Sequence, residues 1–512
     1  MSRTMQAAAR SPRAPEVTVH LFVAADGPGG AADRDYLAGV WQACGSLLGM
    51  TEAIPGLGHP IDLPAGSWDP RRTEVLAARR RGGAGVRQAV LRREQDTWCL
   101  SLVLAPEPGE ALAWADLDAL CTAVLGTPTP GVLGAVRLYT AYRAAPSPAP
   151  RLPAHTELRR SVPADPTAPA SWPEHGAPIE AGIAVWDVSA AGDDATERRL
   201  LITCPVGHAE EPNAVSWIGA GPDLPLSPIA RYLLHSAKVR YQLRVWRTGR
   251  EALLALRDAA DAAVADLLAA TRLVASARRA ADIAAATATA RTVDALQMRE
   301  LGLIDGLTRL REMRRTVEIA STNMTGAGFG SDGTGGLFAE DHALTQWFLN
   351  QLDDDALYVD NALQRAERIG TLADQLVERG QRRRQESVNL GLTGVVGAIV
   401  MALSAIQAFQ YTVDVPQAAK PALIALLGSF ALLSSMIVAN VVTSRRRWTV
   451  ATSHVAVGVV GASLAWLLAV VAAGRHAGPD INALCAGAGM LAGLALSLRT
   501  PRRRRRRAPD RG

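Results

Sequence analysis

The chain has 512 residues, of which 48% are hydrophobic and 20% charged, and its formal net charge is +5. Residues 379–512 hold 17 basic and 4 acidic residues, or +13, which leaves about −8 for the rest. An acidic remainder repels a phosphate backbone, so the composition argues against nucleic-acid binding. The five cysteines are scattered, with no CxxC pair, which excludes a disulfide scaffold and indicates reduced thiols in a cytosolic environment.

The first 145 residues predict a disordered start followed by an α+β domain. Residues 1–15 contain arginines but no apolar core of a signal peptide. From 16 to 145 the hydrophobic period alternates between two and about 3.6. It predicts strands at 17–23, 86–93, 98–104 and 132–142, and helices at 36–48 and 112–125. This order is that of a ferredoxin-like βαββαβ domain.

A linker and a small β-rich segment are expected next. Residues 146–178 are rich in proline, alanine and serine and lack a period, which is typical of a linker. Within 179–226, short strands are expected at 183–188, 199–203 and 214–218. The sequence leaves open whether they extend the first sheet or form a second one.

Helices dominate from residue 227 onward. Ser227 followed by Pro228 predicts a helix start, and apolar residues at three- and four-residue steps predict a helical bundle or coiled coil over 227–325. A glycine-rich loop follows at 326–336, and then a stalk helix at 337–387. If this helix continues to residue 409, it is about 105 Å long from residue 340, and Gly370 and Gly380 are its weakest points.

Four apolar runs near the C-terminus predict a four-helix transmembrane domain over 388–498. The runs are residues 388–409, 421–443, 454–474 and 481–498, each close to the roughly 20 residues that cross a bilayer. A basic tail follows at 499–512. Arginines flank the runs on alternate sides: Arg382, Arg383, Arg384, Arg445, Arg446, Arg447, Arg502, Arg503, Arg504, Arg505, Arg506 and Arg507. This pattern predicts a multi-pass protein of the inner membrane with both termini in the cytoplasm, and arginines that meet anionic lipid.

The interiors of the four runs carry no Asp, Glu, Lys or Arg, which disfavours secondary transport. Small residues are expected to allow close helix packing, either within the chain or between subunits of a homo-oligomer. They are Gly391, Gly394, Gly397, Gly458, Gly461, Gly489 and Gly493. Polar residues such as Ser404, Gln407 and Ser429 leave a weakly polar pore as an alternative.

No constellation of residues predicts catalysis, a cofactor or a metal. The glycines of 326–336 lack the GK[ST] of a phosphate loop. Cys204 and His208 make half a metal site at most, and His20 fits a satisfied strand residue. Asp353 to Asp355 either bind a cation or form a solvated helix face. The sequence therefore predicts a protein that is not an enzyme.

Two resemblances bear on function. A cytoplasmic α/β domain with a long helix entering the membrane resembles the CorA-type magnesium channels in architecture only, since residues 407–412 read QAFQYT rather than carrying their Gly-Met-Asn signature. The segments VTVHLFVA (17–24) and LSPIARYLLHSAKVRYQLRVW (226–246), with Trp41 and Cys44, resemble the actinobacterial CATRA proteins, which are caspase- and TPR-associated components of conflict systems.

The CATRA resemblance implies a membrane-anchored, non-enzymatic component of a bacterial immune-type system. Its cytoplasmic domains would bind a caspase-like or TPR-containing partner, and its four-span bundle would act as effector or anchor. An ion channel with a cytoplasmic sensor domain is the alternative.

Overall fold

The computed structural model describes most of the chain in two compact units. The described residues are 15–25, 29–55, 57–64, 73–107, 109–143, 161–163, 177–180, 183–189, 192–205, 217, 225–277, 280–298, 302–329, 336–411, 416–417, 419–442, 448–473 and 478–499. One unit comprises Met1–Ala259 and Leu296–Leu363, and the other Ala260–Ala295 and Gln364–Gly512.

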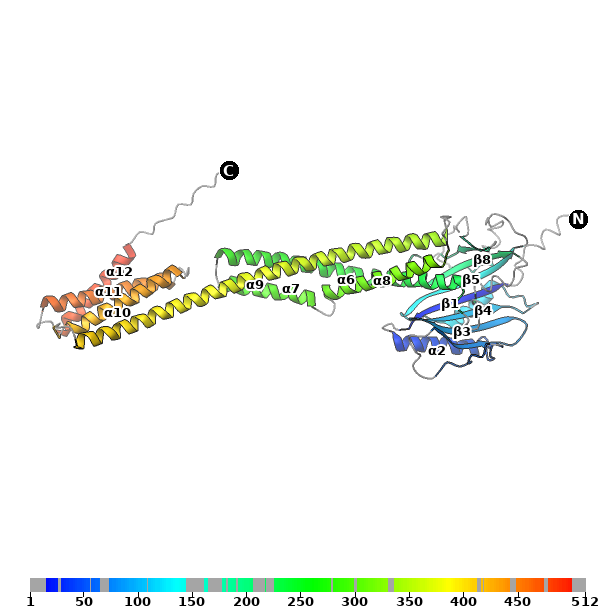
Figure 1. Ribbon diagram of the computed structural model, residues 1–512, viewed down its shortest axis with the longest axis horizontal. Helices are drawn as coiled ribbons and strands as arrows, with labels where there is room; N and C mark the ends of the chain where they lie inside the picture. The colour runs from blue at the N-terminus through cyan, green and yellow to red at the C-terminus, as the bar shows by residue number, and fades with distance from the viewer. Residues whose placement is uncertain are drawn as a thin grey trace, which may run out of the picture. The chain divides into compact units, whose positions relative to one another are not determined.

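The first unit is built on one eight-stranded sheet of order β2-β3-β4-β1-β5-β8-β7-β6 (Figure 1). All neighbours are antiparallel except β5 and β8, which are parallel. The strands are β1 (Glu16–Ala24), β2 (Glu74–Arg80), β3 (Val86–Glu94), β4 (Thr97–Ala105), β5 (Val132–Arg143), β6 (Ala177–Glu180), β7 (Ile183–Asp187) and β8 (Glu197–Pro205).

The sheet is larger than the sequence predicts. The four expected strands lie together as β3-β4-β1-β5, but β2 adds to one edge and β8, β7 and β6 to the other. The strands expected at 183–188 and 199–203 therefore extend the first sheet. The start of β6 falls inside the expected linker 146–178. The strand expected at 214–218 lies outside the described residues except for Trp217.

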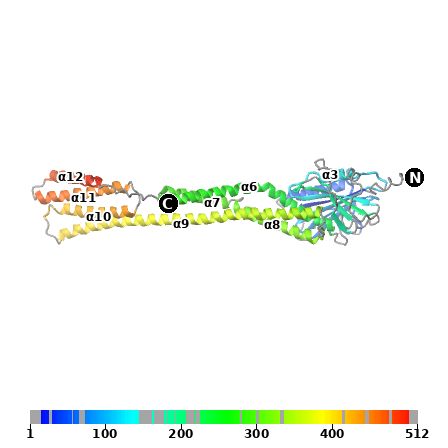
Figure 2. The same ribbon diagram turned by 90° about the horizontal axis from the view of Figure 1, so that it is seen from above.

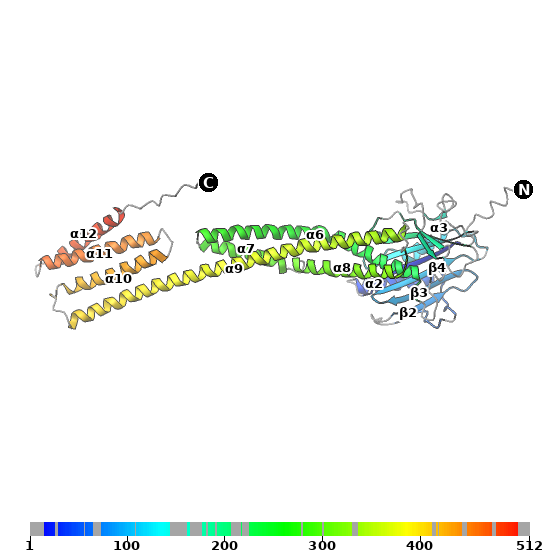
Figure 3. The same ribbon diagram turned by 45° about the horizontal axis from the view of Figure 1, so that its top comes forward.

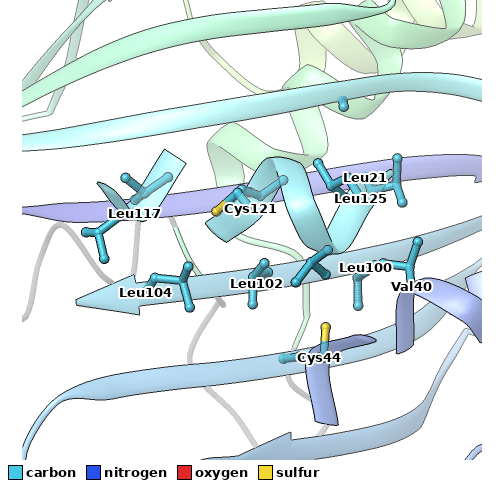
Figure 4. Packing of buried hydrophobic residues seen from close by; sticks show 14 of the residues in the cluster. Leu21, Val40, Cys44, Leu100, Leu102, Leu104, Leu117, Cys121 and Leu125 are labelled. Carbon is cyan, nitrogen blue, oxygen red and sulfur yellow. The ribbon is translucent and has the colours of Figure 1, made fainter. Parts of the chain in front are cut away.

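Helices α2 (Gly30–Ser46) and α3 (Trp114–Leu125) enclose the main core against one face of the sheet. Figure 4 shows side chains of both helices, such as Cys44 and Cys121, among leucines of β1 and β4. The intervening residues of β1 are also buried, since His20 and Phe22 are each 0% exposed. A sheet that is buried on both faces needs a second cover.

Helix α6 (Pro228–Ala277) lies close to the opposite face. As predicted from Ser227 and Pro228, the helix begins at Pro228, and the Ser227 hydroxyl accepts a hydrogen bond from the Ala230 amide at 3.2 Å. A Cβ on Gly134 of β5 would lie 2.9 Å from the Ala237 Cβ, so helix and strand backbones approach closely. Helices α8 (Leu303–Gly326) and α9 (Leu337–Tyr411) begin in the same unit beside α6 (Figure 2).

Helix α9 is continuous through Gly370 and Gly380 and starts at Leu337. Its last part contains the expected first span, 388–409. Among the described residues of that region, the apolar stretch of α9 is Ile399–Ala408, which is shorter than a membrane span. The prediction of four spanning helices is therefore not confirmed.

The second unit contains α7 (Ala280–Met298) over most of its length and three helices long and apolar enough to cross a membrane. These are α10 (Lys420–Val442), α11 (Trp448–Ala473) and α12 (Pro479–Arg499), within which the apolar windows are Lys420–Ile437, His454–Ala472 and Pro479–Leu498. Figure 3 shows the three side by side, α11 between the other two.

Candidate functional site

Two consecutive arginines of β8, Arg198 and Arg199, each take part in a network of charged side chains in the first unit. Arg198 and Arg199 point to opposite faces of the sheet, because successive side chains of a strand alternate. Arg198 is 5% exposed, and each arginine enters a network of charges on its own face. Both networks are built from residues far apart in the sequence.

The network on the α6 face is centred on Asp341 of α9, which is 2% exposed. Its carboxylate accepts hydrogen bonds from Arg198 Nη1 at 2.9 and 3.2 Å and from Arg240 Nη2 at 2.7 Å. The Ser236 hydroxyl donates to it at 2.9 Å. Arg198 also donates to Asp187 of β7 at 3.1 Å through Nε. Two arginines thus face two aspartates, with no net charge.

The mutual charges hold this network in its ionised form. Burial alone would raise the pKa of the Asp341 carboxyl, but the charges of Arg198 and Arg240 outweigh it and the pKa lies below its usual value. Burial would likewise lower the pKa of Arg198, whereas Asp341 and Asp187 raise it. Asp341 is therefore a carboxylate at neutral pH, which suits a structural ion pair.

The network on the other face joins α3 to the sheet. Asp118 Oδ1 accepts from Arg137 Nη1 and from the Tyr139 hydroxyl, both at 2.7 Å. Arg199 Nη1 donates to Asp118 Oδ2 at 3.3 Å, and Glu197 accepts from Arg137 at 3.0 Å. Again two arginines face two carboxylates. The pair Arg198 and Arg199 therefore ties both layers of helices to one strand.

Helix α6 makes further polar contacts with the sheet and its loops. Arg244 donates to four backbone carbonyls, those of Val132, Leu133, Asp194 and Ala195, at 2.8 to 3.2 Å. Lys238 Nζ lies 2.6 Å from Asp96 Oδ1 at the turn between β3 and β4.

Carboxylates of α9 also pair with neighbouring helices. Asp355, which is buried, accepts from Trp246 Nε1 at 2.9 Å and from Arg250 Nε at 3.1 Å. Asp353 pairs with Arg314 of α8, and Asp360 with Arg311. Asp353 and Asp355, weighed from the sequence as a cation site or a solvated face, thus bind arginines, and Asp355 is not solvated.

The structure places the predicted packing glycines in two groups. Gly461 and Gly489 face each other across α11 and α12, where a Cβ on Gly489 would lie 2.3 Å from the Gly461 carbonyl oxygen. A Cβ on Gly493 would meet the Val457 carbonyl at 2.7 Å, and one on Gly458 would meet Leu494 at 3.1 Å. Around Gly397 of α9 no atom lies within 4 Å of that position. The four glycines of α11 and α12 serve packing within the chain. The contacts of Gly391 and Gly394 lie outside the description.

Of the arginines predicted to meet lipid, Arg382 is exposed and pairs with Glu378 one turn earlier. The side chains of Arg383 and Arg384 and the whole of 445–447 and 502–507 lie outside the described residues. The other candidates take structural positions. His20 Nδ1 lies 2.9 Å from the Ser101 hydroxyl, as expected of a satisfied histidine, and Cys204 is buried in β8. His208 is outside the described residues. Within the described ranges no group of three or more His, Cys, Asp or Glu could hold a metal ion.

Sequence reasoning missed Asp341, Arg198 and Arg240. One signal was available: Tyr232, Ser236 and Arg240 recur every four residues, which places three polar groups on one face of the helix. A polar stripe on a buried helix predicts a buried polar partner, although not its identity.

Comparison with known proteins identifies the chain's two parts. The family model of the CASPASE and TPR Repeat-Associated N-terminal domain, CATRA-N, matches residues 16–219, and that of the C-terminal domain, CATRA-C, matches residues 227–366. No curated protein and no solved structure matched the chain. The first match covers the eight strands, and the second covers α6 to the first part of α9, so the network around Asp341 joins the two matched segments. Because the matches cover most of its length, the chain belongs to the CATRA family of caspase- and TPR-associated proteins.

Proposed function

We propose that this protein is a membrane-anchored, non-enzymatic component of a caspase- or TPR-associated conflict system. The observation that carries the proposal is α9, which begins at Leu337 within the CATRA-C segment and continues beyond that segment to Tyr411. Three helices of membrane-spanning length follow it in the sequence. The same helix thus belongs both to the family's domain and to the region before the membrane helices.

The α+β and helical parts are the proposed partner-binding region. The family's name implies association with caspase or TPR proteins. A caspase-like or TPR-containing protein is accordingly the partner that we propose, on the cytoplasmic side. The antiparallel order β3-β4-β1-β5 with α2 and α3 on one face supports a ferredoxin-like centre in the larger sheet.

The arginine pattern supports both termini in the cytoplasm, with 388–409 as the first of four spans. Hydrogen bonds and ion pairs account for the charged residues of both networks, which is the reason to propose a binding and coupling role rather than catalysis. The lipid bilayer is then the second partner.

The membrane part of the proposal is tested by extraction of isolated membranes with alkaline carbonate. The full chain is expected to stay in the membrane pellet. Leu464→Arg together with Leu468→Arg places two charges in the middle of α11, at about 2.5–3.5 kcal/mol each on insertion scales, and is expected to lower the membrane-bound fraction. Leu357→Arg in α9 is the control, since Leu357 is similarly exposed at 57% but lies in the first unit. Release of the unmodified chain by carbonate would contradict the anchor.

The partner part is tested by affinity purification of the tagged full chain from native membranes in mild detergent. We expect a caspase-like or TPR-containing protein to be recovered in stoichiometric amount. Its absence after chemical crosslinking would overturn the partner assignment. Reconstitution in liposomes addresses the channel alternative, because selective conductance without any partner would favour a channel.

A further inference from the structure

The arginine partners of Asp341 have other hydrogen-bond acceptors, which a contact with a purely structural role, a brace, would not need. Asp341 belongs to α9, whereas the described side chains that donate to its carboxylate belong to β8 or α6; they are Arg198, Tyr232, Ser236 and Arg240. Arg198 has a second carboxylate, Asp187, and Arg240 has a second acceptor, the Asp193 carbonyl at 2.9 Å. If Asp341 leaves, both arginines keep a partner.

Burial of these four charges is also a poor way to gain stability. Removing two ions from water costs several kcal/mol for each, and well-packed apolar residues often serve as well or better. The best-attested use of such a group is to fix one arrangement among alternatives, or to switch between two. On separation the Asp341 carboxylate is free to be hydrated, and among its donors in the described residues only the Tyr232 hydroxyl, at 3.4 Å, has no second partner. The arrangement therefore suits a contact that opens.

We propose that Asp341 is a latch that holds the start of α9 against β8 and α6, and that it opens with Arg198 remaining on Asp187. In the closed state the Asp341 carboxylate accepts hydrogen bonds from Arg198, Ser236 and Arg240. In the open state the first turns of α9 separate from β8, while Asp355 still holds α9 to Trp246 and Arg250 further along. The link from this latch to the membrane helices rests on the proposed function, but the latch itself does not.

The latch is tested by hydrogen–deuterium exchange of the full chain in detergent. Asp341→Asn removes the charge at nearly constant shape, and we expect exchange of the amides of residues 339–348 to rise at least about tenfold, because hydrogen bonds to charged groups are the stronger ones. Exchange in β1, β4 and β5 is expected to stay unchanged. The matched control is Asp355→Asn, which should raise exchange near residue 355 and leave 339–348 unaffected.

A second variant separates a latch from a brace. Asp187→Asn removes the carboxylate that receives Arg198 in the open state, so the closed state is favoured and exchange at 339–348 should slow. A brace predicts the opposite, since loss of any member of the network would loosen its neighbours. Faster exchange in Asp187→Asn, or no change in Asp341→Asn, would overturn the proposal. Neither result bears on membrane anchoring or partner recovery, which the tests of the proposed function measure separately.

Discussion

Glu16, the first residue of β1, shows how the fold sets the chemistry of a single group. It is 8% exposed, and its Oε1 atom has no hydrogen-bond partner among the described residues. Burial raises the pKa of its carboxyl from 4.5 to about 7. The folded protein therefore favours the protonated acid, and the ionised form is the costly one.

The stability of the first unit should depend on pH through this residue. Below pH 4.5 the acid is protonated in both states and has no effect; between 4.5 and 7 stability falls, and above 7 the penalty is complete. Glu16→Gln removes an ionisation penalty of about 3 kcal/mol at pH 8 and has no such effect at pH 4. Urea unfolding followed by tryptophan fluorescence at both pH values measures the difference. The exposed Glu74→Gln serves as control, and an equal gain at both pH values would contradict the role of ionisation.

Individual charges were the least predictable feature of the sequence. Asp341 and Arg198 are 143 positions apart, and a carboxylate can be buried only if its counter-charge reaches it in the fold. Local pattern therefore does not identify such pairs: for Asp355 it offered a cation site or a solvated helix face, and neither is a buried pair with an arginine. His20 was predictable because an apolar strand gave its context without reference to a distant partner.

At the scale of elements, the hairpin of α11 and α12 depends on glycine rather than on apolar area. The two backbones meet at Gly461 and Gly489, with no room for a methyl group. In a bilayer, lipid tails are as apolar as the side chains, so burying apolar side chains between helices gains little free energy. Close packing of the backbones is then a main source of helix association. The sequence predicted these glycines by their spacing but could not say which helices they join.

We predict that Gly489→Ala separates these helices. Its Cβ would lie 2.5 Å from the Ala465 Cβ as well as against the Gly461 carbonyl, so both helices must shift. Overpacking of this kind costs on the order of 1–3 kcal/mol. The thermal midpoint of the second unit in detergent should therefore fall by several degrees. Gly487→Ala lies in the same helix with no atom within 4 Å of its Cβ and should leave the midpoint unchanged. Equal effects of the two would refute the packing role.

The start of α6 offers a second prediction for an element. Ser227→Ala removes the side chain that caps the Ala230 amide and should lower the free energy of unfolding by about 1 kcal/mol. Thr248→Ala, inside the same helix, removes only a bond to the Arg244 carbonyl and is the control. Denaturant unfolding of both variants makes the comparison; a loss of similar size in both would show that the cap contributes nothing particular.

Strands were predicted well where the apolar alternation was long and poorly where it was short. Strand β2 has the sequence EVLAARR, directly after a glycine- and proline-rich stretch, and β6 has only four residues. Both are stabilised by pairing with a neighbour more than by their own pattern, since strand propensity depends on the surroundings.

For the molecule as a whole, the first compact unit combines the segment matched by the CATRA-N model with residues 227–259 and 296–363 of the segment matched by the CATRA-C model. The single side chain of Arg244 donates to carbonyls of both β5 and the loop before β8. Gly134 of β5 has no side chain, which allows the α6 backbone to approach the sheet closely. Whether 179–226 extends the first sheet was undecidable from the sequence, because pairing between distant strands leaves no local mark.

We therefore expect a single cooperative unfolding transition for the sheet together with residues 228–259 of α6. Near-ultraviolet signals of core tryptophans and helical ellipticity should share one midpoint in the first unit. Arg244→Ala should lower the midpoints of both signals together. The free energy of unfolding should fall by about 2–3 kcal/mol, because four carbonyls lose a charged donor. Arg247→Ala breaks only an exposed pair with Asp194 and should cost less than about 1 kcal/mol. Separate midpoints for the two signals would show independent domains.

The neighbouring arginines of β8 have a consequence for how that strand finds its place. Both of its faces are buried and carry leucines or isoleucine, so apolar contacts alone would tolerate a slip by one residue. The charges do not. If the strand slips so that Glu197 takes the place of Arg198, Glu197 faces the carboxylates of Asp187 and Asp341. If it slips the other way, Arg198 takes the place of Glu197 and faces Arg137. The triplet Glu197-Arg198-Arg199 thus fixes the register of β8 against β5, a parallel neighbour to which no hairpin joins it.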